Sequence, residues 1–333
     1  MIVSRLVFVI VLVASVMAAG VSNAQQSDFD ERCAAAGVVN CVGFDNDTQD
    51  IVPGENLYPD GLGTYRASLD TSVKASGDGS LRFDLPPPPH AGANIAGSWS
   101  PSNNRGLGQL FGENSTFYVQ FRQRFSESML NNTWDSSWKT VIFHMNQTTC
   151  GGIEITTINR LMSGLLAMYT GCGSPSMFTT LDGSQQTESP PLLLQQGDYN
   201  CQYSRENRSD CWYFPADEWV TFYYKISLGN WDQRNSMIEL WVARDGATSY
   251  EQVIRVPNMP MTCNAANCAG SGEGYNNVTF TPYMTALSNN SGRSGVTSHM
   301  WVDEFIVSTQ PIALPGQSSA VRRPNPPESL VAQ

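Results

Sequence analysis

The sequence predicts an all-β fold, a two-sheet antiparallel β-sandwich of the jelly-roll type with long loops stapled by disulfide bonds. Three observations indicate it. About a dozen short segments alternate apolar and polar residues, as strands with one buried face do. Turn-forming Gly, Pro and Asn residues separate these segments, and helical patterns are almost absent. No unit of about 20–50 residues repeats, which excludes propellers and solenoids.

The 333-residue chain divides into three predicted parts. Residues 1–24 are typical of a secretory signal peptide, because an apolar run over residues 6–19 is followed by the small residues at 22–24. The run is shorter than the roughly 20 residues of a membrane span, so we expect no membrane contact after cleavage. Residues 25–315 are predicted to form one jelly-roll domain, and residues 316–333 a disordered, Pro-containing tail.

Eight cysteines follow the predicted signal peptide, and an even count fits an oxidising compartment, either the periplasm or the extracellular space. Sequence neighbours suggest four local bonds, although the sequence leaves the pairing open: Cys33–Cys41, Cys150–Cys172, Cys201–Cys211 and Cys263–Cys268. No Cys-x-x-Cys pair occurs, which disfavours a zinc site. The cysteine pattern therefore predicts a secreted protein without a bound metal at its reactive centre. We also expect the protein to be a monomer.

The balance of charges narrows the choice of partner. A formal net charge of −11 argues against nucleic-acid binding, which depends on a broad basic surface. An acidic polysaccharide remains possible as a partner, because a few cations that converge in a cleft act more strongly than the net charge does.

The predicted strands follow one another through turns and loops. A short helix is expected over residues 28–36, and the first strand begins at Cys41. The alternating pattern places the later strands at residues 68–73, 79–85, 116–125, 138–146, 153–159, 164–170, 219–228, 237–244, 252–256, 278–285 and 299–308. Residues 173–216 have no strong period, and an insertion of this length predicts a rim or lid beside a site.

Residues 116–125 and 138–146 are predicted to form the floor of a carbohydrate cleft. In each segment every second residue is apolar, so the residues between them share the opposite face. Those faces carry the polar residues Tyr118, Gln120, Arg122, Arg124, His144 and Asn146. The strand at 219–228 supplies a similar face with Thr221, Tyr223 and Lys225.

Glycoside hydrolysis is disfavoured but stays open. Retaining hydrolases need two carboxylates about 5 Å apart, and on jelly rolls these commonly share a strand as Glu-x-Asp-x-x-Glu. Here Glu154 is followed by Thr156 and Asn159, so the partner carboxylates are missing. A pair from two strands, Glu154 with Glu239, is the remaining route. Three histidines and no Gly-x-Ser-x-Gly elbow give no support for a serine triad.

β-Elimination on a uronic acid polymer fits the available residues better. A cation or amide must neutralise the sugar carboxylate, a base must remove the C5 proton, and an acid must protonate the departing O4. We predict Arg122 or Arg124, with Gln120 or Asn146, for the first role. His144 is predicted for the second role and Tyr223, assisted by Lys225 or Arg122, for the third. The predicted substrate-binding set is Gln120, Arg124, Asn146, Glu154, Asn159, Lys225 and Trp241.

Five segments carry a resemblance to a known superfamily: residues 79–83, 118–126, 138–144, 218–222 and 301–308. Together they resemble the concanavalin A-like jelly rolls, especially polysaccharide lyases acting on alginate, glucuronan or heparin-like chains. The resemblance implies two stacked sheets with a concave substrate face, and a Tyr with a His or a second Tyr as catalysts. The chain lacks the Arg-Ser-Glu-Leu and Tyr-Phe-Lys-Ala-Gly motifs of the alginate lyases.

The resemblance also implies that no cofactor is required, and that a structural calcium could lie near Asp45 and Asp303. Two other functions stay open on the same fold. One is a non-catalytic, lectin-like protein whose aromatic residues, including Tyr223 and Trp241, stack on sugars. The other is the hydrolase that would use Glu154.

Overall fold

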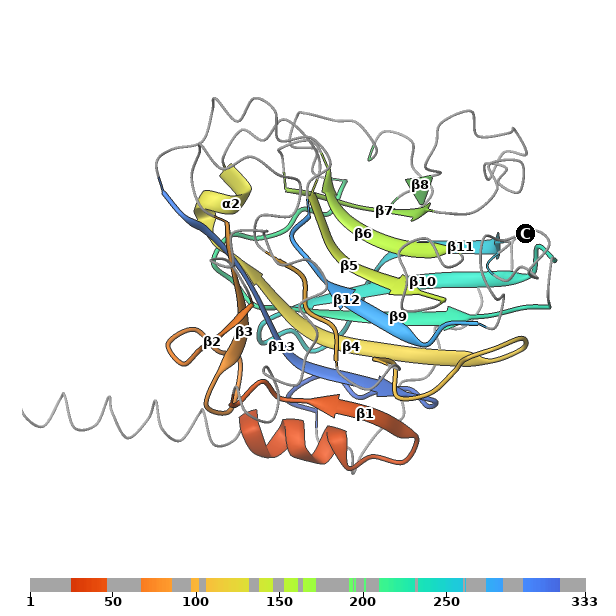
Figure 1. Ribbon diagram of the computed structural model, residues 1–333, viewed down its shortest axis with the longest axis horizontal. Coiled ribbons are helices and arrows are strands. Elements are labelled where there is room, and N and C mark those ends of the chain that lie inside the picture. Colours follow the sequence, from red (N-terminus) through yellow and green to blue (C-terminus); the bar gives the residue numbers. More distant parts are fainter. Residues whose placement is uncertain are drawn as a thin grey trace, which may run out of the picture.

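The computed structural model describes residues 25–46, 67–85, 97–101, 106–131, 138–145, 153–160, 164–171, 192–193, 195, 201, 210–230, 233–259, 261, 274–283 and 296–317. Within these ranges the fold is two stacked antiparallel β-sheets (Figure 1), which confirms the predicted all-β sandwich. The predicted signal peptide, the tail from residue 318 and the cysteines Cys150, Cys172, Cys263 and Cys268 lie outside the described residues.

The larger sheet has eight strands in the described part of the chain. Its order is β11-β10-β9-β4-β13-β3-β2, and β1 pairs with β13 beside this path. The strands are β1 (Val38–Val42), β2 (Ser68–Asp70), β3 (Ser80–Leu85), β4 (Thr116–Phe125), β9 (Val220–Ser227), β10 (Ser236–Arg244), β11 (Glu251–Met259) and β13 (Ser298–Ser308).

The smaller sheet has five strands among the described residues, in the order β12-β5-β6-β7-β8. These are β5 (Trp138–His144), β6 (Glu154–Arg160), β7 (Leu165–Gly171), β8 (Leu192–Leu193) and β12 (Asn277–Phe280). The strands β5, β6 and β7 form the predicted meander, and the distant β12 joins it along β5.

The main core lies between the two sheets, where alternate side chains from both meet. Phe121 of β4 and Phe222 of β9 stack with ring centroids 5.5 Å apart, and Phe143 of β5 packs edge-on against Tyr224 at 5.1 Å. The Tyr224 hydroxyl meets the Thr157 hydroxyl of β6 at 2.8 Å, which satisfies two polar groups inside this core. The residues between these apolar positions therefore face outward on each sheet.

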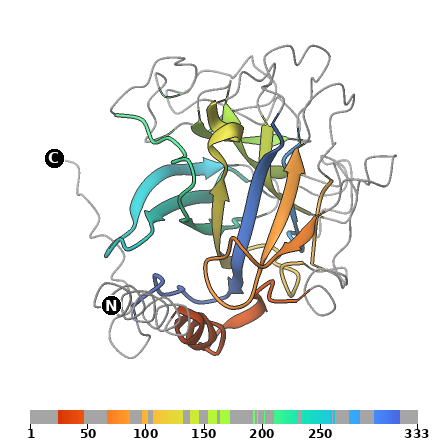
Figure 2. The ribbon, with the colours of Figure 1, turned by 90° about the vertical axis from the view of Figure 1, so that its left-hand side faces the viewer.

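A helix over residues 25–33 precedes β1 and covers part of the eight-stranded sheet. Figures 1 and 2 place this helix and the five-stranded sheet on opposite sides of the eight-stranded sheet. The Cys33–Cys41 disulfide joins the end of the helix to β1, and Phe29 packs on Tyr223, Ile306 and Ile312. Cys201 and Cys211 are also bonded, so two of the predicted disulfides are confirmed.

One prediction about neighbouring strands is wrong. The segments 116–125 and 138–146 do not form one cleft floor, because β4 belongs to the eight-stranded sheet and β5 to the five-stranded sheet. A short helix, α2 (Glu127–Asn131), begins directly after β4, and the chain then passes to the other layer. The alternation had correctly identified which residues are apolar, but it does not encode the sheet in which a strand pairs.

Candidate functional site

The predicted catalytic residues are divided between the two outer faces of the sandwich. Arg122 and Tyr223 project from the eight-stranded sheet, whereas His144 projects from the five-stranded sheet, and the core separates them. They therefore do not converge in one groove. This arrangement corrects the expectation that the polar faces of β4, β5 and β9 line a single site.

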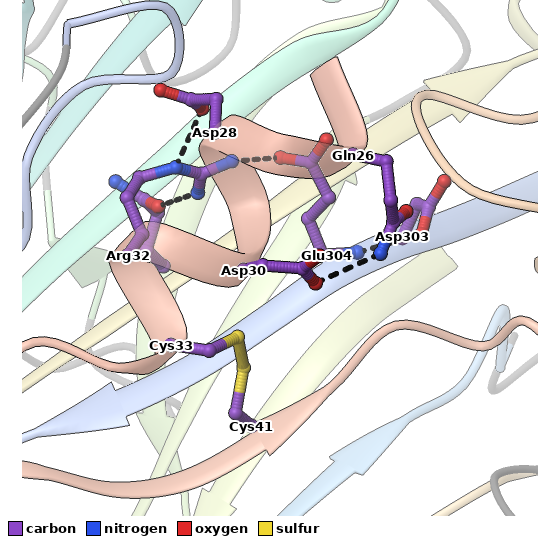
Figure 3. Close-up of a disulfide and its surroundings, with 9 residues drawn as sticks. Gln26, Asp28, Asp30, Arg32, Cys33, Cys41, Asp303 and Glu304 are labelled. Atoms are coloured by element: carbon purple, nitrogen blue, oxygen red, sulfur yellow. Dashed lines mark hydrogen bonds and ion pairs between the residues drawn. A yellow bond between two sulfur atoms is a disulfide. The ribbon is translucent and has the colours of Figure 1, made fainter. Parts of the chain in front are cut away.

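The outer face of the eight-stranded sheet is occupied by the protein itself. Arg32 of the N-terminal helix is buried and contacts the carboxylates of Glu304 and Asp28 and the amide oxygen of Gln120 (Figure 3). Burial alone would lower the pKa of Arg32, but the carboxylates of Glu304 and Asp28 outweigh that effect and raise it. A predicted substrate-binding residue, Gln120, is thus buried against the helix.

Arg122 and Tyr223 also belong to this covered outer face of the eight-stranded sheet. Arg122 is buried and pairs with Asp245 at 2.6 Å and with Glu304 at 3.7 Å. Tyr223 is covered by neighbours that include Tyr250, and its burial raises its pKa well above the usual range. A buried phenol with a raised pKa is a weaker proton donor than a free tyrosine. The geometry of these two residues is that of a packed structural layer.

Three further predicted binding residues lie on this same outer face. Arg124 pairs with Asp217 at 3.3 Å and lies over the Trp301 ring at 5.8 Å. Lys225 pairs with Glu239 at 2.8 Å, and Trp241 packs beside Tyr223. All three are therefore on the opposite side of the sandwich from His144.

The outer face of the five-stranded sheet holds a second polar group centred on His144. Its ring nitrogen Nε2 lies 3.0 Å from the Thr279 hydroxyl, and Nδ1 lies 3.4 Å from a carboxylate oxygen of Glu154. The three residues come from adjacent strands, β12, β5 and β6, and all three are buried. Of the predicted binding residues, Glu154 is thus next to His144. Asn146 lies outside the described residues, and Asn159 is placed in β6 by its backbone alone.

Asn277 is a residue that the sequence reasoning missed. It lies directly opposite His144 in the β12–β5 pair, so the two side chains share one face. Its amide oxygen accepts a hydrogen bond from the Ser100 hydroxyl at 2.6 Å. The same hydroxyl also lies 2.6 Å from the Val278 carbonyl oxygen, so its single proton is shared by two acceptors. The Asn277 amide NH2 carries the donors that a ligand can use.

A second missed group lies further along the same face. The ammonium nitrogen of Lys139 is 4.8 Å from the ring centroid of Tyr283 and 5.9 Å from that of Tyr169. Lys139 is in β5 and Tyr169 in β7, and all three residues are partly exposed. Lys139 and Tyr169 thus bring a cation and a phenol together on this face, the residue types that the sequence had assigned through Lys225 and Tyr223.

The carboxylates predicted to bind calcium accept hydrogen bonds from backbone N–H groups. Asp303 accepts the N–H groups of Ala75 at 2.7 Å and Ser76 at 3.3 Å, and burial together with Glu304 raises its pKa well above the usual range. Asp45 accepts the N–H of Asp78. No group of three or more metal-ligating side chains occurs among the described residues. Calcium binding stays a prediction.

No helix in the described part of the chain is long and apolar enough to cross a membrane.

The positions of the two candidate carboxylates also test the glycoside hydrolase alternative. Glu154 lies in β6 of the five-stranded sheet and Glu239 in β10 of the eight-stranded sheet. The two carboxylates therefore face opposite sides of the sandwich and cannot flank one glycosidic bond. The predicted pair for a glycoside hydrolase is wrong.

Comparison with solved structures identifies the fold. A PL-14 alginate lyase from Aplysia kurodai aligns over 82% of this chain and 99% of its own, with a TM-score of 0.54 and 11% sequence identity. The protein shares the β-sandwich fold of this enzyme. An endo-β-1,4-glucuronan lyase from the fungus Trichoderma reesei aligns over 77% of this chain and 90% of its own, with 14% identity and a TM-score of 0.48. No protein-family model and no curated protein sequence matches the chain. At 11% identity the likeness to the first of these structures shows the fold alone, and the reaction has to be argued from the residues.

Proposed function

We propose that the protein is a secreted polysaccharide lyase that cleaves a uronic-acid-containing glycan by β-elimination on the outer face of the five-stranded sheet. The observation that supports it most is the cross-strand pair of His144 and Asn277, with Lys139 and Tyr169 on the same face. This set contains the base, the amide donor, the cation and the phenol that the reaction needs. The lyase fold raises the expectation of this chemistry, but the residues carry it.

His144 is the proposed base and Asn277 the proposed carboxylate binder. The Asn277 NH2 group donates to the uronate carboxylate and withdraws charge from it, which makes the C5 proton more acidic. The imidazole takes that proton. The electron pair of the C5–H bond then forms the C4–C5 double bond, and the bond from C4 to the glycosidic O4 breaks.

Tyr169 is the proposed acid for the departing O4. It lies two strands from His144, about 10 Å across the sheet at the backbone, and both side chains rise from the same face. A sugar between them can present C5 to the imidazole and O4 to the phenol. Lys139 stabilises the phenolate left after the proton transfer. Tyr283, on the other side of Lys139, is a further contact for the polymer.

The test is the formation of an unsaturated uronate. Incubation with alginate, glucuronan, pectate and glycosaminoglycans is expected to give, with at least one of them, the ultraviolet absorbance of a double bond conjugated to a carboxylate. The His144→Gln variant is expected to lose activity by a factor of about 100 or more, as removal of a general base does. Arg244→Gln is the matched control, because Arg244 is exposed on the opposite sheet.

Two results would contradict the proposal. Equal rates for His144→Gln and Arg244→Gln would exclude His144 as the base. Binding of glycans on an array without any unsaturated product, for every polymer tested, would select the lectin-like alternative instead.

Export and the nature of the partner belong to the same proposal. The Cys33–Cys41 and Cys201–Cys211 bonds support an oxidising compartment. The carboxylate-binding role of Asn277 and the cation Lys139 favour an anionic polymer. We infer a protein that acts outside the cytoplasm as a monomer, without a cofactor in the reaction.

A further inference from the structure

We infer that Glu154 is a positioning residue that holds the proton of His144 on Nδ1 and so leaves Nε2 as the basic atom. The inference rests on the proposed function, since it concerns the base of the elimination. It gives Glu154 a role that differs from both sequence-based expectations, substrate binding and participation in glycoside hydrolysis.

The arrangement of three strands supports this assignment. Thr279, His144 and Glu154 form a line across β12, β5 and β6, and the imidazole lies between the hydroxyl and the carboxylate. Each of the three is at least nine-tenths buried, so water competes little for the ring nitrogens. The pairing of the three strands and the burial of the side chains therefore hold Thr279, His144 and Glu154 next to one another.

The chemistry of the two neighbours differs in a way that selects one tautomer. A carboxylate oxygen accepts hydrogen bonds and, when ionised, cannot donate them, so it favours a proton on the nitrogen that faces it. A threonine hydroxyl can donate, so it can satisfy an unprotonated Nε2 at the observed 3.0 Å. Within the neutral ring, both neighbours thus favour the tautomer with the proton on Nδ1.

The 3.4 Å separation between Nδ1 and Glu154 is an ion-pair distance rather than a formed hydrogen bond, and Nδ1 has no hydrogen-bond partner among the described residues. Catalytic contacts of this kind are often long without substrate and shorten in the complex. When Nε2 takes the C5 proton, the ring becomes a cation, and the buried carboxylate at Nδ1 stabilises that charge. The Thr279 hydroxyl must rotate away from Nε2 at this step, so Thr279 is expected to matter less than Glu154.

The groups around the dyad are limited in the described part of the chain. From β12 the ring faces Thr279 and Asn277, which do not titrate, and from β6 it faces Glu154. Tyr275 is close enough to Glu154 for the carboxylate to raise its pKa, an effect that adds to that of burial. A tyrosine with a raised pKa stays neutral, so Tyr275 adds no negative charge beside His144.

The experiment measures the tautomer directly and the kinetics separately. Imidazole-nitrogen NMR of the full-length protein with labelled histidine is expected to show His144 protonated on Nδ1, and His144→Gln identifies its signals. Glu154→Leu is expected to reduce the share of the Nδ1–H tautomer and to lower kcat about 100-fold or more with KM within about threefold, since a positioning effect acts on the chemical step. Glu154→Gln, whose amide oxygen can still accept from Nδ1, is expected to retain more activity than Glu154→Leu.

Each outcome supports or overturns the inference about Glu154. Thr279→Val is the matched control and is expected to keep the Nδ1–H tautomer and most of kcat. An unchanged tautomer in both Glu154 variants, or a higher KM with kcat unaltered, would overturn the inference, the latter in favour of sugar binding. If Glu154→Leu does not fold, Glu154→Ala replaces it, because its side chain likewise cannot accept a hydrogen bond from Nδ1. If the wild type forms no product from any polymer, the proposed function fails, while the NMR result still shows whether Glu154 sets the proton.

Discussion

On the outer face of the eight-stranded sheet, Arg32 and Arg122 meet Glu304 inside a layer closed by the N-terminal helix. On the outer face of the five-stranded sheet, His144 meets Thr279 and Glu154, and Lys139 lies between two partly exposed tyrosines. The two faces have similar residue types. They differ in how their cations are used: the first face pairs its arginines with buried carboxylates, whereas the second holds a titratable ring and an ammonium group on aromatic rings. Polar residues on an alternating strand therefore indicate an outward face, but only the partners show whether that face serves stability or chemistry.

The largest expected effect is on the first face. Replacing Arg32 by Met leaves the Glu304 carboxylate buried without its nearest cation, and breaking such a pair costs about 3–5 kcal/mol of unfolding free energy. Urea unfolding followed by tryptophan fluorescence measures the loss. Arg244→Met is the matched control, because its pair with Glu218 is exposed and is expected to contribute less than about 1 kcal/mol. Equal losses in the two variants would show that the helix layer is not held by this ion pair.

A smaller effect is expected at Asp70, at the β2 end of the same face. Burial alone would raise the pKa of Asp70, but hydrogen bonds from Ser72, Trp301 and Arg82 outweigh it and hold the pKa well below the usual range. The ionised group therefore stabilises the fold above its unfolded pKa of about 4, and this contribution is lost as the pH falls toward the folded pKa.

Asp70→Asn should accordingly lower the unfolding free energy at pH 7 by about 1–3 kcal/mol, the range for hydrogen bonds to a charged group. The gap from the wild type should narrow as the pH falls below about 4. Urea titrations across that range measure the gap. Asp217→Asn, which removes a half-exposed carboxylate, is expected to change little at either end. A gap that stays constant with pH would mean that the charge of Asp70 contributes nothing.

The smallest effect is expected at Tyr223, and it sharpens the comparison most directly. Tyr223→Phe removes a hydroxyl that accepts only a long contact, 3.4 Å, from the Ile312 N–H. We expect a stability loss below about 1 kcal/mol and a lyase rate within about twofold of the wild type. Tyr169→Phe, assayed beside it, should lose far more activity. A large rate loss in Tyr223→Phe would indicate that the reaction takes place on the outer face of the eight-stranded sheet.

Local information explains what the sequence predicted well. Alternation located β4, β6, β9, β10 and β13 within a few residues, since burial of one face of a strand requires it. The Cys33–Cys41 and Cys201–Cys211 bonds join near neighbours in sequence, so spacing sufficed to suggest them. Counting alternate positions through the predicted meander from β5 to β7 could also have placed Tyr169 on the face that holds Lys139.

The site itself depended on contacts that the sequence does not reveal locally. His144 and Thr279 are 135 residues apart, and nothing near either residue indicates that β12 pairs with β5. Arg32 is 88 residues from Gln120, so the polar face of β4 gave no sign that the N-terminal helix would cover it. The predicted convergence of Arg122 and Tyr223 with His144 was wrong for this reason: the outward face of each strand was correct, but the partner segments were unknown.

The pairing of β1 with β13 has a consequence for how the chain acquires its structure. The contact between Arg32 and Glu304 spans 272 residues, so the first helix and strand have no complete docking surface until the final strand has been synthesised. Contacts between distant segments slow folding, because a long loop must close before they form. A nascent chain with this topology should stay open until its last strand emerges. That delay fits the proposed export, in which a chain crosses a membrane before it folds.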